Sequence, residues 1–214
     1  QEIVITVNPE STSDVYSIPD YASVGSRPWS NATTSLQAVY IGDDVTGIGQ
    51  NAFSNMTALR DLDFEDPSDL TYIGESAFQG ATYLAEDNLN LSHVTTLGKS
   101  AFSGCSGITG VTLGESLNAV EDGRTIENKI AEGAFQNTGL TKVNIPSTVT
   151  EIGDSAFRGC SLREVGELDL PDGLTKIGDS AFMLSMGSGE SSAGITSLVI
   201  PSTVTEIGAN AFSG

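Results

Sequence analysis

The sequence predicts an α/β repeat fold: a right-handed solenoid with a parallel β-sheet on one face and short strands and 3₁₀ or helical turns on the other. Two observations carry this prediction. Residues 145–153 and residues 200–208 share the nine letters IPSTVTEIG. Self-similarity of this kind is the sequence signature of a stacked repeat array. The dipeptide Ala-Phe also recurs in one local context, ending at Phe53, Phe78, Phe102, Phe135, Phe157, Phe182 and Phe212.

Aligned on these phenylalanines, the copies share the template L-x-x-L-x-L-P-x-x-V-x-x-I-G-x-x-A-F. Apolar residues two apart predict a short strand with one side buried. The glycine permits a tight corner, and the segment Gly-x-Ser-Ala-Phe predicts a single helical or 3₁₀ turn with the ring inside. Stacking such coils at about 4.8 Å buries a continuous apolar core that no single repeat could bury.

We assign residues 36–214 to the solenoid, with about seven repeats and the last one incomplete, which predicts a longer parent protein. Residues 1–35 are assigned to an amino-terminal cap whose core contains Tyr21 and Trp29. Insertions interrupt the period near residues 118–130 and 183–194. The Asp122-Gly123 step predicts a hairpin in the first insertion, and the Gly/Ser-rich second insertion predicts a loop.

Charge restricts the classes of partner. The chain has 28 acidic and 9 basic residues, giving a formal net charge of -19. Nucleic acids and anionic membranes attract basic surfaces, so neither is expected as a partner. No apolar stretch approaches the roughly 18 residues of a membrane span, which predicts no direct membrane insertion. The chain begins at Gln1 and its first methionine is Met56, so we expect that a signal peptide was removed.

The segments around the phenylalanines resemble the BspA-like, or Treponema-type, leucine-rich repeat of bacterial cell-surface proteins. The resemblance is carried by IGESAFQGA (73–81), LGKSAFSGC (97–105), IGDSAFRGC (152–160) and IGANAFSG (207–214). Residues 1–35, with Asp20-Tyr21 and Pro28-Trp29, are similar to the cap found on these proteins. The resemblance implies a leucine-rich-repeat solenoid in a secreted or surface-anchored bacterial protein, located outside the cell or on its surface and active in adhesion.

The sequence offers little catalytic chemistry. Its one histidine, His93, is expected in a turn or on the surface, and no nucleophile motif or phosphate-binding loop is present. We therefore expect no enzyme and no catalytic, cofactor or metal site. Cys105 and Cys160 occupy one repeat position two repeats apart, about 10 Å, which is too far for a disulfide. Both are expected to be reduced, buried packing groups.

Acidic residues gather at Asp61, Asp63 and Asp66. Hard cations such as Ca²⁺ prefer several oxygen ligands, so a calcium site near these three residues is one alternative. The spacing is not that of an EF-hand loop, and a solvated acidic patch is the expected state.

The outward positions of the first strand in each repeat form the candidate interaction face. Its residues are Asp61, Asp63, Asn90, Thr112, Lys142, Asn144 and Asp169. We expect this face to bind an extracellular protein or glycan. These positions contain no aromatic residue or arginine, the types enriched in binding hot spots. The alternative is therefore a passive structural spacer within a longer surface protein.

Overall fold

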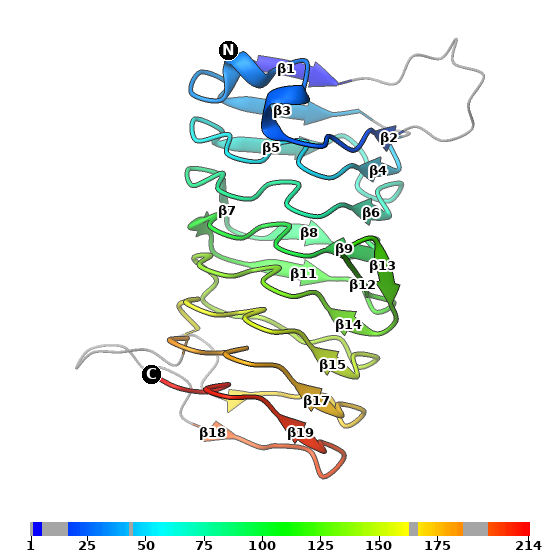
Figure 1. The fold of residues 1–214 in the computed structure, drawn as a ribbon, viewed down its shortest axis with the longest axis vertical. Helices are drawn as coiled ribbons and strands as arrows, with labels where there is room; N and C mark the ends of the chain where they lie inside the picture. Colours follow the sequence, from blue (N-terminus) through cyan, green and yellow to red (C-terminus); the bar gives the residue numbers. More distant parts are fainter. Residues whose placement is uncertain (1, 6–16, 43–44, 163–166, 186–196) are drawn as a thin grey trace.

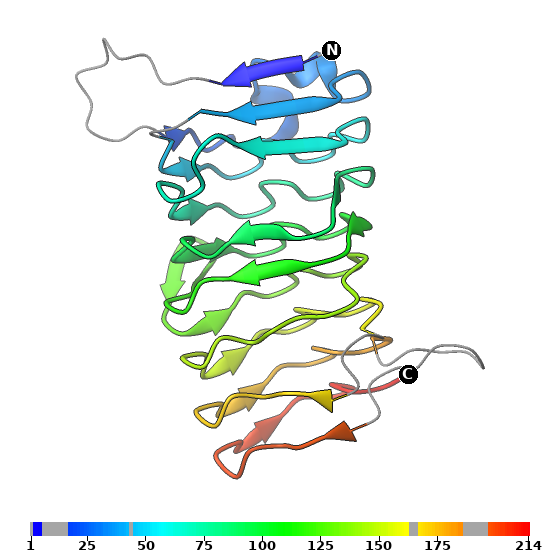
Figure 2. The same ribbon diagram turned by 180° about the vertical axis from the view of Figure 1, so that it is seen from behind.

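The computed structural model describes residues 2–5, 17–42, 45–162, 167–185 and 197–214. The chain forms an elongated stack of coils that starts with the amino-terminal strand at one end and finishes with the last coil at the other (Figure 1). Successive coils place their strands on the same two sides of the stack, and the view from behind shows the same layering (Figure 2). The predicted repeat solenoid is confirmed.

One side of the stack, here called the strand face, carries the first strand of each coil. These strands pair in parallel as β1-β3-β5, β8-β11 and β16-β18. In β5, β8 and β11 the side chains alternate between the core and solvent, because successive residues of a strand point to opposite faces. The strands are β1 (Glu2–Ile5), β3 (Ala38–Ile41), β5 (Asp61–Phe64), β8 (Leu89–Leu91), β11 (Val111–Leu113), β16 (Glu167–Leu168) and β18 (Ser197–Leu198), with the short pair β7 (Ala85–Glu86) and β10 (Gly107–Ile108) preceding β8 and β11.

The opposite side also forms parallel ladders. They run in the orders β2-β4-β6-β9-β12 and β14-β15-β17-β19. The sequence predicted only short strands on this side, and the structure joins them into sheets. The strands are β2 (Ser17–Ile18), β4 (Gly47–Ile48), β6 (Tyr72–Ile73), β9 (Thr96–Gly98), β12 (Asn118–Glu121), β14 (Lys129–Ile130), β15 (Glu151–Ile152), β17 (Lys176–Ile177) and β19 (Glu206–Ile207).

The turn around each phenylalanine differs from the helical or 3₁₀ turn expected from the sequence. Two residues in each turn, one two positions before the ring and one two positions after it, have positive φ, which interrupts a right-handed helical path. The first set is Asn51, Ser76, Ser100, Gly133, Ser155, Ser180 and Asn210, and the second is Asn55, Gly80, Gly104, Asn137, Gly159, Leu184 and Gly214. The described 3₁₀ helices, η1 (Val24–Ser26) and η2 (Ser30–Ala32), both lie before the first such turn.

This backbone shape creates a third ladder along the stack. In the turn around Phe78, the N–H groups of Ser76, Phe78 and Gly80 donate to carbonyl oxygens of the next coil at 2.9, 2.8 and 2.7 Å. The other coils repeat the pattern, and each of these bonds points from one coil to the following one. The phenyl rings stack inside this ladder, from Phe53 to Phe212, with neighbouring centroids 5.2 to 5.9 Å apart.

Among the described residues, no turn of this kind precedes the first coil, and side chains near η1 and η2 take its place. Arg27 Nη1 donates to the carbonyl oxygen of Ser54 at 2.7 Å, and Trp29 Nε1 donates to that of Ala52 at 2.8 Å. The backbone N–H of Tyr21 donates to Gln50 at 2.9 Å. Tyr21 and Trp29 are partly buried against the core, as expected. The domain boundary at residue 35 stays a prediction.

The first insertion contains the predicted hairpin. Strand β13 (Arg124–Ile126) pairs antiparallel with β12, and the turn residues Asp122 and Gly123 both have positive φ, as a two-residue hairpin turn requires. The hairpin interrupts the ladder of its side, because β12 and β14 are not paired. Side chains bridge this interruption: buried Lys129 contacts Glu121 at 3.0 Å and Glu151 at 2.9 Å.

Candidate interaction face

The seven residues predicted from the sequence are all solvent-exposed on the strand face. Asp61 and Asp63 lie on β5, and Asn90 on β8 is in register with Thr112 on β11. The other three are Lys142, Asn144 and Asp169, of which the first two lie on an extended segment and the last follows β16. The structure therefore spreads them along several coils and does not gather them into one compact cluster.

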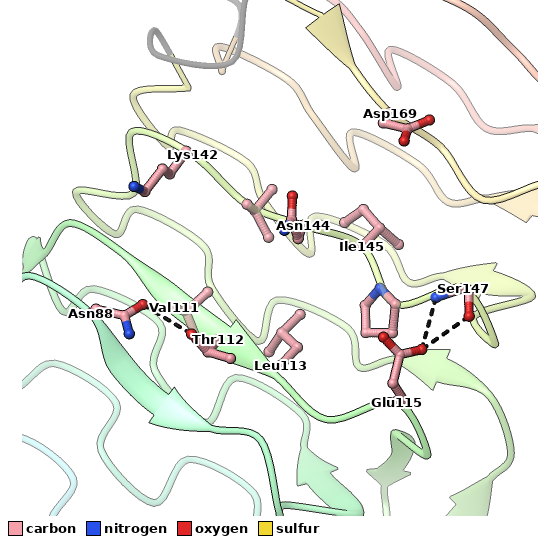
Figure 3. A pocket seen from close by; sticks show the side chains of 12 residues that line it. Asn88, Val111, Thr112, Leu113, Glu115, Lys142, Asn144, Ile145, Ser147 and Asp169 are labelled. Carbon is pink, nitrogen blue, oxygen red and sulfur yellow. Dashed lines mark hydrogen bonds between the residues drawn. The ribbon is translucent and has the colours of Figure 1, made fainter.

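The middle of this face is hollowed. A depression with a volume of about 840 Å³ lies between β11 and residues 142–147 (Figure 3). Four of the seven predicted residues line it: Thr112, Lys142, Asn144 and Asp169. Asn88, the apolar Ile145 and Pro146, and the carboxylate of Glu115 contribute to its walls. Asp61, Asp63 and Asn90 do not line it, so the candidate face contains one concave region and a separate acidic region around β5.

Aromatic and arginine side chains missed by sequence reasoning lie beside the acidic region. Tyr40 on β3 is 37% exposed and in register with Asp63. The guanidinium of Arg60 lies 5.2 Å from the ring centroid of Tyr83, which is 59% exposed. The seven predicted positions themselves contain no aromatic residue or arginine, but the residues beside Asp61 and Asp63 do. Exposed tyrosine and arginine are residue types enriched in binding hot spots.

Carboxylates crowd the acidic region. Half-buried Glu86 on β7 has a raised pKa, first because burial disfavours its charged form and then because Asp61, Asp63 and Asp87 repel it, although a hydrogen bond with the backbone of Leu62 opposes the shift. The hydrogen bonds from Ser68 lower the pKa of Asp66. Within the described ranges, no three acidic, histidine or cysteine side chains are placed to hold a metal ion. Calcium near Asp61, Asp63 and Asp66 stays a prediction.

The cysteine prediction is confirmed. Cys105 and Cys160 are free and buried, and each thiol donates to a phenylalanine carbonyl of the preceding coil, at 3.1 Å in both cases. Burial raises the pKa of Cys105 to about 12 and that of Cys160 to about 11. Thiols that stay protonated are poor nucleophiles, so both are packing groups.

Other expectations concern the surface and the second insertion. His93 is exposed, with its ring Nδ1 3.2 Å from the hydroxyl of Ser92, in agreement with the predicted surface position. No helix in the described part of the chain is both long and apolar enough to cross a membrane. Residues 186–196 of the second insertion lie outside the described residues.

Comparisons with known proteins place these features in context. The sequence model described as BspA type leucine-rich repeat region matches residues 13–124 and 128–214 in six copies, with its gap at the end of β13. No curated protein matches the sequence.

Two solved structures share the fold, a leucine-rich cell surface protein from Faecalibacterium prausnitzii and a leucine-rich repeat protein from T. pallidum. The first is 24% identical with a TM-score of 0.55, and the alignment covers 99% of this chain and 66% of that one. The second is 18% identical with a TM-score of 0.53, and the alignment covers 97% and 72%. The chain thus spans 66% of the first protein's length.

Proposed function

This chain belongs to the BspA-type leucine-rich repeat family, and from that premise we propose that it is a secreted or cell-surface bacterial interaction protein. Its strand face would bind an extracellular protein or glycan, as in adhesion, and would carry out no chemical reaction. The supporting observation is the exposed polar face with its depression. Inward residues of each strand hold the core, so the outward residues are free to vary and to contact a partner.

The acidic region is the part of this face that is suited to first contact. Asp61 and Asp63 project from one strand, Glu86 and Asp87 lie close to them, and the exposed Arg60–Tyr83 pair flanks the group. A negative surface accelerates the approach of basic partners, and exposed aromatic groups then supply contact area. The negative charge of the whole chain acts in the same direction.

The test is a binding screen of the purified protein against extracellular-matrix proteins, mucins and neutral glycans, with and without calcium. Saturable binding should survive moderate salt. The double variant Asp61→Lys/Asp63→Lys should weaken it at least tenfold without lowering the melting temperature. A matched control, Glu127→Lys/Asp172→Lys, changes the net charge equally at exposed positions away from β5 and should bind as the wild type does.

The spacer hypothesis predicts a different result. A passive spacer would show no saturable partner in any condition of the screen, although the protein is folded. Equal weakening by both double variants would mean that net charge alone drives the association, and it would contradict a role for the acidic region of this face.

A further inference from the structure

The depression beside β11 collects polar side chains from four successive coils. Asn88 precedes β8, Thr112 lies on β11, Asn144 lies on the extended segment of the next coil, and Asp169 follows β16. Coils stack at about 4.8 Å, so these positions span roughly 14 Å along the axis of the solenoid. The volume of about 840 Å³ falls within the range of small-molecule sites, and the length allows an elongated ligand.

Two hydrogen-bonded pairs hold the sides of the depression in place (Figure 3). The hydroxyl of Thr112 donates to Asn88 Oδ1 at 3.1 Å. The N–H and the hydroxyl of Ser147 both donate to Glu115 Oε2, at 3.2 and 3.0 Å. Among the described residues, the amide nitrogen of Asn88 and the second carboxylate oxygen of Glu115 remain without a partner. These groups are oriented before a ligand arrives, which lowers the entropic cost of binding.

Three further side chains of the depression are unpaired. In the part of the chain that the structure describes, Lys142, Asn144 and Asp169 form no side-chain hydrogen bond and no ion pair, and all three are exposed. The ammonium of Lys142 offers only donors, the carboxylate of Asp169 only acceptors, and the amide of Asn144 offers both. A ligand that satisfies this set must both donate and accept hydrogen bonds.

The charges of the lining distinguish between classes of ligand. An anionic group would pair with Lys142, but Glu115 and Asp169 would repel it, as would the net charge of the chain. A cationic group would pair with the two carboxylates, but Lys142 would repel it. Uncharged hydroxyl groups both donate and accept, so neighbouring hydroxyls can meet all of these side chains without repulsion. The apolar Ile145 and Pro146 add contact area for the C–H groups of a ring.

We propose that the depression binds an uncharged oligosaccharide, a ligand class that rests on the interaction function proposed above and refines it. Lys142 would donate to sugar oxygens, and Glu115 and Asp169 would accept from sugar hydroxyls. The amide of Asn144, which lies between Lys142 and Ile145 in Figure 3, would do both. Sugar hydroxyls that leave water need a new partner for each hydrogen bond that they lose, so removal of one such side chain should weaken binding.

The probe is an array of immobilised oligosaccharides in which neutral chains of hexoses and N-acetylhexosamines stand beside sialylated and sulfated chains. The wild-type protein should bind neutral chains in preference to charged ones. Calorimetry with a soluble form of a bound chain then gives its dissociation constant. This constant should change less than twofold between low and moderate salt, because salt screens interactions between charges and the ligand carries none.

Three variants locate the site and test its chemistry. Asn144→Ala removes the amide from the depression and should weaken binding at least tenfold. The matched control Asn31→Ala removes the same group at an exposed position in η2, outside the depression, and should leave binding unchanged. Lys142→Gln keeps a hydrogen-bond donor without the charge, so it should retain most of the affinity for a neutral chain. An anionic ligand would instead lose its binding to Lys142→Gln.

Several results would overturn the proposal. They are a preference for sialylated or sulfated chains, binding that Asn144→Ala leaves intact while the protein stays folded, and the absence of any bound chain on the array. An isolated oligosaccharide tests the depression alone, whereas the acidic region is tested with whole proteins in the screen above. A protein partner found there would still stand, so the two failures are distinguishable.

Discussion

The indole ring of Trp29 lies flat on the phenyl ring of Phe53, with centroids 5.4 Å apart and planes 11° apart. Its Nε1 also donates to the carbonyl oxygen of Ala52. One side chain thus closes both the column of rings and part of the backbone ladder at the first end of the solenoid. The exposed end of a repeat array needs such a closure, because its core and its hydrogen-bonding groups would otherwise face water.

Removal of a central ring should be costly. Phe157 is fully buried between Phe135 and Phe182, so Phe157→Ala should lower the free energy of unfolding by about 3–5 kcal/mol. Urea denaturation followed by circular dichroism measures it. The control is Phe212→Ala, because Phe212 is only partly buried and stacks on one described ring. A cost as large as that of Phe157→Ala would contradict the role assigned to sandwiched rings.

Arg27 should matter for stability despite its distance from the strand face. Its guanidinium donates to the carbonyl oxygens of Asn51, Ala52 and Ser54. Arg27→Leu leaves carbonyl groups of the first coil without donors, and it should destabilise the protein by about 2–4 kcal/mol. The exposed Arg60→Leu control should change stability by less than about 0.5 kcal/mol. Thermal unfolding of both variants measures the change in stability. Equal effects would contradict the role of Arg27 as the donor to the carbonyl groups of the first coil.

Leu184 occupies a position that other turns fill with glycine or asparagine. It has φ of 59° and is 55% exposed, so it bears the strain of a left-handed conformation and gains little burial. Leu184→Gly should therefore stabilise the protein by roughly 0.5–1 kcal/mol. Met183→Gly, at the neighbouring position with negative φ, should destabilise it instead. Denaturant midpoints measure both changes, and the same sign for both would contradict this reading of the turn.

Glu86 should make stability depend on pH. Its pKa in the folded protein is raised, so the folded state disfavours its charged form. The sign follows from linkage: the relative stability is greatest below the unfolded pKa, near 4.3, and is lost as pH rises through the folded value. Glu86→Gln should raise the melting temperature at pH 7 and differ little from the wild type near pH 4. Exposed Glu65→Gln should show no such pH-dependent gain.

Pattern alone was sufficient for the repeat, the strand face and the reduced cysteines. Each depends on which residues alternate or recur, and Cys105 and Cys160 share their position with Ala81. The conformation of Ser76 was not predictable in this way. Its sequence context is typical of a helix start, but the ladder to Lys99 holds it at positive φ. At Ser76, the hydrogen bond to the next coil therefore outweighs the local preference of the sequence for a helical conformation.

The candidate site was only partly predictable for a similar reason. Alternation along the strands correctly identified exposed residues such as Asn144. The depression beside β11, however, is lined by residues of neighbouring coils, and the Arg60–Tyr83 contact joins two coils. Spacing within one repeat carries no information about either.

The one-way hydrogen bonds of the phenylalanine turns have an electrical consequence. Peptide dipoles that point along one axis add together, as they do in an α-helix, leaving partial negative charge where carbonyl groups are unmet and partial positive charge at the other end. Here the carbonyl end is the first coil, where Arg27 places its cation. A buried guanidinium that forms no ion pair with any described carboxylate is thereby explained. The solenoid therefore has a dipole along its axis. A coil whose turn hydrogen bonds ran in the reverse direction would oppose the dipoles of all the others.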